Sequence, residues 1–383
     1  MKLNRTKYIE LCEYFLALLL WLSIPPYFVW EINNFQQYLL LIFVFLSFII
    51  SKKISKFDLP FFAIFFLIYT VFAIRSGKNV FGILEVSLLC CILLLSKTFL
   101  QQIFNKLIKL YAILIIPSII IYILVIIFGI SLSYNIINPL NEGKNFFYLQ
   151  YPFLVTPPIT ELSFYFRFYG YFDEPGVVGT ISGVLLLLNR VDLKKWETYP
   201  LLISGVFSFS LVFFILLVIS IVLFQQIKYK IILISVLLLL GIYFSTNEIV
   251  GNLVFERIKI EDARLGGDNR TVETMDNFMK QFWDSDKLFW GYGNNYNLIV
   301  NPGGASYKDL IVNHGILGFS LFCIAVLLFA YKNIGYSKYF YIYIILFSAI
   351  MYQRPFINLL IYFILIFVSI FYLKYQKLQN NLR

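Results

Sequence analysis

The chain has 383 residues, of which 60% are hydrophobic and 20% aromatic, and its formal charge at pH 7 is +10. Soluble globular domains contain about 45 to 50% apolar residues, so this composition excludes an ordinary soluble protein. A positive charge can indicate nucleic-acid binding, but here the basic residues gather beside apolar segments, as the positive-inside rule describes for membrane proteins. We therefore expect a membrane protein without a nucleic-acid partner.

Apolar stretches of about 17 to 25 residues can cross a bilayer as helices. The sequence predicts an all-α polytopic membrane protein with about 12 transmembrane helices, which form one integral membrane domain over residues 1–383. The expected spans are 12–30, 36–50, 59–74, 80–96, 109–130, 176–189, 197–209, 211–225, 230–245, 310–331, 338–353 and 356–373. Basic residues flank the first and the last span, so we expect both termini in the cytoplasm.

The stretch 197–225 decides the topology of the middle of the chain. If it were a single span, Lys228 and Lys230 would face outward. Two short helices that turn near residues 208–210 place both lysines inside, in agreement with the positive-inside rule. This second alternative puts two large loops, 131–175 and 246–309, on the outer side of the membrane.

The first large loop ends in a group of charged residues, Arg167, Asp173 and Glu174, immediately before an apolar segment. Pro175 disfavours helix at Glu174 and suits the first turn of a helix, so Glu174 should lie near an N-cap. One interpretation is that Glu174 only caps the helix and Arg167 reaches lipid headgroups. Another is a substrate cleft, because several glycines allow close backbone approach; they are Gly170, Gly176, Gly179 and Gly183.

The second large loop carries further candidate substrate-binding residues, Arg257, Arg264 and Arg270. Apolar residues recur at helical spacing over 271–284, which predicts a helix that packs over the membrane domain. Arg270 precedes this helix. Charge interspersed at this density is also how an ordinary surface stays soluble. Arg354 lies between the last two spans on the outer side, so it could join Arg167 and Arg270 around one anion.

The single histidine, His314, lies at the outer end of the expected tenth span. Ionisable groups at membrane depth are costly and often functional, and histidine exchanges a proton near neutral pH. A histidine that serves only packing is the alternative. The pattern Asp284-Ser285-Asp286 matches a metal-binding motif of nucleotide-sugar transferases, but it stands where a helix ends and nucleotide sugars are cytoplasmic. We therefore expect no metal and no cofactor.

Four motifs, taken in order, resemble those of one membrane-protein family. They are Arg-Phe-Tyr-Gly-Tyr-Phe-Asp-Glu-Pro-Gly at 167–176, Phe-Ser-Phe-Ser at 207–210, Leu-Phe-Trp-Gly-Tyr-Gly at 288–293, and Ser-Tyr-Lys-Asp-Leu-Ile-Val-Asn-His-Gly-Ile-Leu-Gly-Phe at 306–319. With the helix count and the two outer loops, the chain resembles the Wzy-type O-antigen polymerases and, more distantly, the O-antigen ligases. The resemblance covers most of the chain.

The resemblance implies a GT-C-like fold with two large periplasmic loops in the bacterial inner (cytoplasmic) membrane. It also implies inverting, metal-independent glycosyl transfer between undecaprenyl-pyrophosphate-linked oligosaccharides, with a chain-length-regulating membrane protein as a further partner. Arg167 and Arg270, and with them Arg354, would bind the pyrophosphate. Glu174 or His314 would orient or deprotonate the acceptor hydroxyl. Whether the product is O-antigen or capsule stays open.

Two alternative functions follow from the same features. Ligases usually show a histidine at the start of the segment that begins here with Ser306 and Tyr307, so its absence favours a polymerase. A flippase for lipid-linked oligosaccharides, or another transporter, would commonly show internal repeats and charges at the membrane midplane. This sequence shows no evident repeat, and its charges lie in the outer loops.

Overall fold

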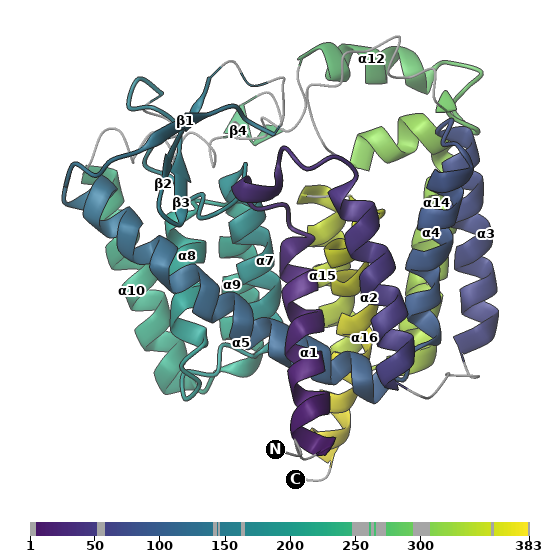
Figure 1. The fold of residues 1–383 in the computed structure, drawn as a ribbon, viewed down its shortest axis with the longest axis horizontal. Coiled ribbons are helices and arrows are strands. Elements are labelled where there is room, and N and C mark those ends of the chain that lie inside the picture. The colour runs from purple at the N-terminus through teal and green to yellow at the C-terminus, as the bar shows by residue number, and fades with distance from the viewer. Residues whose placement is uncertain are drawn as a thin grey trace. The chain divides into compact units, whose positions relative to one another are not determined.

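The structure is a computed structural model. It describes residues 5–51, 58–140, 144, 146–161, 165–246, 260–261, 264–265, 273–293, 307–353 and 356–381. These residues are mostly helical and belong to two compact units (Figure 1). The first unit consists of Met1–Ile24, Ile32–Leu107 and Arg270–Arg383, and the second of Pro25–Glu31 and Ile108–Asn269.

The first unit is a bundle of apolar helices around α16, with the amphipathic helix α12 beside α14. Its helices are α1 (Arg5–Leu22), α2 (Phe35–Ser51), α3 (Leu59–Arg75), α4 (Val80–Cys91), η3 (Ile92–Leu94), α12 (Glu273–Trp283), α14 (Tyr307–Ile334), α15 (Lys338–Gln353) and α16 (Leu360–Asn381). Helix α16 is buried on all sides from Leu360 to Leu373, and it packs against α1, α14 and α15. Aromatic rings fill this core, for example Phe65 against Phe367 with centroids 4.7 Å apart.

The second unit is built around α7. Its elements are η1 (Tyr27–Val29), β1 (Asn135–Ile137), β2 (Tyr148–Tyr151), β3 (Leu154–Thr156), α7 (Pro175–Leu188), α8 (Thr198–Phe207), α9 (Leu211–Phe224), α10 (Ile227–Thr246), β4 (Ile260–Glu261) and β5 (Arg264–Leu265). Helix α5 (Lys97–Tyr122) contributes its residues from Ile108 onward and continues as a π-helical stretch, η4 (Ile123–Ile127). Every residue of α7 except Val177 is buried, mainly by α8 and α9.

Each of the twelve predicted apolar segments overlaps a helix. Among the described helices, three are long and apolar enough to cross a membrane, namely Lys97–Ile127, Tyr307–Ile334 and Leu360–Leu378. The other apolar helices are shorter, so the number of twelve spans stays a prediction. The first segment was placed too far along the chain, because α1 ends at Leu22, shortly before two prolines that cannot continue a helix.

The loop 131–175 is not free of strands, which corrects the all-α prediction. It contains a three-stranded antiparallel sheet in the order β1-β2-β3, and a second, two-stranded sheet joins β4 to β5. Strands β2 and β3 pair through Tyr151 and Leu154, with Phe153 between them in the left-handed region at φ 65°. Strands of three or four residues are too short for alternation to reveal them in the sequence.

The predicted break near residues 208–210 is confirmed. Helix α8 ends at Phe207, α9 begins at Leu211, and Phe209 between them has φ 49°. The two helices approach closely because Gly205 has no side chain: a Cβ there would overlap the ring of the fully buried Phe213. The orientation of this turn relative to the membrane stays a prediction.

We expect Gly205→Ala to lower the free energy of unfolding by about 1 to 3 kcal/mol, since the added methyl group overpacks the α8–α9 contact. Unfolding of the purified protein in detergent, followed by tryptophan fluorescence, measures the loss. Ile203→Ala, at an exposed position on the same helix, should change it by less than about 0.5 kcal/mol. Adding Phe213→Leu should recover part of the loss; a Gly205→Ala protein as stable as the wild type contradicts the packing argument.

Candidate functional site

Helix α7 begins directly after the two carboxylates at the end of the first large loop. Glu174 is its N-cap residue, with φ −143° and ψ 135°, and Pro175 occupies the first turn, as predicted. The Glu174 side chain makes no capping hydrogen bond, so helix capping does not account for this carboxylate. The side chain is half-buried in the second unit.

Arg167 lies inside the same unit, with 7% of its surface exposed. Its Nε donates to the carbonyl oxygen of Ser208 at 3.1 Å. The turn at 207–210 also packs on α7, where Gly179 leaves no room for a Cβ beside Ser208 and Ser210. Arg167 and the start of α7 therefore share this turn as a neighbour. Such burial does not fit a guanidinium that reaches out to lipid headgroups.

Asp173 is 9% exposed and forms an ion pair with Lys144, whose Nζ lies 2.7 Å from Oδ2. The main-chain carbonyl of Asp173 accepts from both Lys144 Nζ and the Tyr148 hydroxyl, each at 2.5 Å. Asp173 Oδ1 is buried without a hydrogen-bond partner in the part of the chain that the structure describes. Burial, and after it the charge of Asp173, raises the pKa of Tyr148, so this phenol stays a neutral donor.

Lys144 and Tyr148 are not among the residues that the sequence motifs indicate. Lys144 is the one basic residue between positions 110 and 166, which is a signal that could have identified it. Tyr148 is one of 28 tyrosines. Nothing in the sequence distinguishes it from the others, because its place beside Asp173 comes from the pairing of β2 with β1 and β3.

Hydrogen bonds to the main chain fix the segment 166–171 ahead of the carboxylates. The Tyr122 hydroxyl donates to the Phe166 carbonyl at 2.5 Å, and Val155 N donates to the Gly170 carbonyl at 2.9 Å. Gly170 has φ 60°, a conformation that L side chains rarely adopt. The charged groups that follow are therefore held by the fold before any ligand arrives, which is the condition for electrostatic preorganisation.

We call Lys144, Tyr148, Arg167, Asp173 and Glu174 the α7 cluster. It combines two cations, two carboxylates and a neutral phenol at the N-terminal end of a buried helix. A guanidinium suits oxyanions, and the positive end of a helix dipole adds to that preference. A half-buried carboxylate can accept a proton from a hydroxyl group. The α7 cluster can therefore bind an oxyanion and activate a hydroxyl.

His314 lies in the first unit, on α14, and is 7% exposed. Its imidazole stacks on the Phe72 ring, with centroids 3.8 Å apart and planes 7° from parallel. Among the described residues no group bonds to its Nδ1, which is buried. Packing against Phe72 therefore explains the position of the imidazole ring, but it does not explain why Nδ1 is buried without a partner among the described residues.

Helix α14 is kinked beside the histidine. Gly315 has φ 72° and ψ 171°, so the residues before and after it form two helical pieces. The segment 288–293 crosses the kink and bonds to both pieces: Tyr292 N donates to the Val312 carbonyl at 2.8 Å, and Ile316 N donates to the Leu288 carbonyl at 3.0 Å. Two motifs that the sequence analysis treated separately thus form one structural unit.

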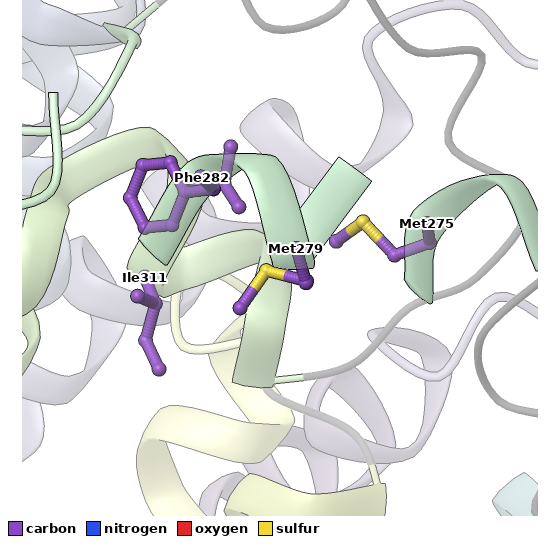
Figure 2. Close-up of a cluster of buried hydrophobic side chains, with 5 residues drawn as sticks. Met275, Met279, Phe282 and Ile311 are labelled. Atoms are coloured by element: carbon purple, nitrogen blue, oxygen red, sulfur yellow. The ribbon is translucent and has the colours of Figure 1, made fainter. Parts of the chain in front are cut away.

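Helix α12 confirms the predicted helix at 271–284. Its apolar face packs against the first piece of α14, where Met275, Met279 and Phe282 meet Ile311 and the neighbouring valine (Figure 2). This contact anchors the chain that leads from α12 into the segment 288–293. The helix therefore supports the kink at His314.

The remaining candidates are not placed by the structure. Arg257, Arg270 and Arg354 lie outside the described residues, and only the backbone of Arg264, in β5, is described. The expectation that Arg167, Arg270 and Arg354 surround one anion therefore stays a prediction. Within the described residues no group of histidine, cysteine, aspartate and glutamate side chains could hold a metal ion.

Comparisons with known proteins found no matching family model, no matching curated protein and no matching solved structure. The functional argument therefore depends on the geometry of this chain and on the motif resemblance.

Lys144→Met should lower the free energy of unfolding by about 3 to 5 kcal/mol, because it leaves the buried Asp173 carboxylate without its cation. Asp173→Asn should have a similar cost. In the double variant the losses should not add, with a coupling of about 1 kcal/mol or more, since each substitution removes the same pair. Denaturant unfolding in detergent measures all three proteins, and additive losses would show that the pair contributes nothing as a pair.

Proposed function

We propose that this protein is a membrane polysaccharide polymerase. It joins undecaprenyl-pyrophosphate-linked oligosaccharide repeat units by inverting, metal-independent glycosyl transfer. The reaction takes place at the outer face of the bacterial inner membrane, with both termini of the chain in the cytoplasm.

The observation that supports this proposal is the α7 cluster. Only 14% of the residues in the chain are charged, and burying a charge costs free energy unless it is paired or used. Arg167 and Asp173 are nevertheless buried together in an apolar helical unit, and Glu174 beside them is not used as a helix cap. Buried charged side chains of this kind are typical of a site where charge develops during a reaction.

In the proposed reaction the acceptor hydroxyl oxygen forms a bond to the anomeric carbon of the donor sugar. The bond between that carbon and the pyrophosphate oxygen breaks, and the lipid pyrophosphate leaves with the electron pair. Arg167 stabilises this charge, and its Nε bond to Ser208 orients the guanidinium beforehand. Glu174 takes the proton of the acceptor hydroxyl, with His314 as the alternative base.

Arg167→Ala should reduce chain extension by about 100-fold or more, because the leaving group loses a preorganised donor. Arg167→Lys should restore only part of the rate, since an ammonium lacks the rigid, planar set of donors with which the guanidinium bonds the Ser208 carbonyl and faces a phosphate. Polymer length from purified enzyme and lipid-linked repeat units measures the effect. Lys194→Ala, at an exposed basic residue of the same unit, serves as control. A folded Arg167→Ala enzyme that makes chains of normal length and amount rules out the pyrophosphate role.

Glu174→Gln should express normally and lose polymerisation by about 100 to 10,000-fold, because glutamine keeps the shape of the side chain but cannot accept a proton. His314→Gln should retain some activity. The same assay decides between them, with size-exclusion chromatography to confirm folding. An active Glu174→Gln enzyme beside a folded but inactive His314→Gln enzyme would make His314 the base.

A further inference from the structure

Arg75 connects two segments that are more than 200 residues apart in the sequence. It is the last residue of α3, and its Nη2 donates to the carbonyl of Gly291 at 3.1 Å and to the carbonyl of Trp290. Hydrogen bonds from a charged donor are stronger than neutral ones. One guanidinium nitrogen therefore holds two consecutive carbonyls of the segment 288–293.

That segment can reach the α14 kink only because of its glycines. Gly291 has φ 76°, and a Cβ on it would lie 2.5 Å from Gly315 N. Gly315 has no room for a Cβ either, because the Phe289 carbonyl lies against it. The carbonyls that Arg75 holds thus belong to the stretch of chain that touches the residues on both sides of His314.

The histidine ring is held from the same helix. Phe72, which stacks on His314, precedes Arg75 by three residues on α3, so both side chains lie on one face of that helix. Gly318, one turn after His314, leaves room for the Phe72 ring, because a Cβ on Gly318 would lie 3.2 Å from Cε1 of Phe72. Phe72 fixes the plane of the imidazole, and Arg75 fixes the chain that crosses the kink beside it.

We propose that Arg75 is a positioning residue for His314. It acts through the carbonyls of Trp290 and Gly291, which keep the segment 288–293 closed over the kink and the imidazole enclosed against Phe72. Within the described chain, His314 Nδ1 and Arg75 Nε are both buried without a hydrogen-bond partner, so the fold does not use either atom. The proposal depends on the proposed function only for the statement that His314 acts on the acceptor.

A simpler role for Arg75 is to stabilise the C-terminal end of α3, where a cation interacts favourably with the helix dipole. That role would leave the environment of His314 unchanged. Lys78, three residues farther on, is a matched control for this helix-end role. Its ammonium pairs with Glu85 at 3.5 Å, and in the described structure it has no bond to the segment 288–293.

Chemical modification of the histidine tests the proposal without any assumption about catalysis. His314 is the only histidine, so carbethoxylation of its ring by diethyl pyrocarbonate, followed by mass spectrometry, reports on one site. In Arg75→Gln the rate should rise at least about tenfold, because loss of the charge-assisted bonds makes local opening more frequent. In Lys78→Gln the rate should equal that of the wild type. Equal rates in Arg75→Gln and the wild type overturn the proposal.

A second variant covers the case in which Arg75→Gln does not fold. Arg75→Lys keeps the charge at the end of α3, but its Nζ lies one bond closer to the main chain than Arg75 Nη2 and should not reach the two carbonyls, so the modification rate should again rise. A role limited to the helix end predicts no rise in this variant. A rate equal to that of the wild type therefore also overturns the proposal.

Polymer synthesis provides the second arm of the experiment. Arg75→Gln should reproduce the defect of His314→Gln, and the double variant should be no worse than His314→Gln alone, because both substitutions act through one group. Additive defects would show that Arg75 acts elsewhere. If the wild type makes no polymer, the proposed function fails, whereas the modification rates still decide whether Arg75 positions the histidine.

Discussion

The enclosure of α7 is the constraint on which the rest of the second unit depends. A helix that is buried along its whole length can be approached on every side only if some of its residues are small. The turn between α8 and α9 packs against Gly179, and Leu216 of α9 packs against Gly183. Because these contacts fix α7, they also fix its N-terminal end, where Asp173 pairs with Lys144. The position of the charges therefore follows from apolar packing elsewhere along the helix.

The sequence predicts the local features of this fold better than it predicts contacts between residues far apart in the chain. The apolar segments after the first, the break at 208–210, the N-cap position of Glu174 and the helix α12 each depend on neighbouring residues, and each is found where it was expected. The short strands, the kink at Gly315 and the pairs Lys144–Asp173 and Arg75–Gly291 depend on residues far apart in the chain. Hydrophobic periodicity carries no information on such partners, and three-residue strands have too few positions to show a period. The charged residues of a candidate site can thus be found in a sequence, whereas a partner such as Tyr148 cannot.

The motifs behind the family resemblance contain many residues that packing alone explains. Gly291 and Gly315 have positive φ and no room for a Cβ. Ser208 offers its carbonyl to Arg167 and lies against α7. Any chain with this arrangement of helices would need small residues at these places, whatever it does. In this chain these residues therefore serve first the packing of α7 and of the α14 kink.

Three residues have buried polar atoms that packing does not explain. Buried polar atoms in native proteins nearly always have a partner, and an unpaired one costs free energy without any return in stability. Asp173 Oδ1 in the second unit, and His314 Nδ1 and Arg75 Nε in the first, are buried and unpaired among the described residues. Each of these residues also has a partner that holds its other polar atoms or its ring: Lys144 for Asp173, Phe72 for His314, and the carbonyls of Trp290 and Gly291 for Arg75. The unpaired atoms are therefore held in place by the fold and are the ones that the proposed roles of these residues would use.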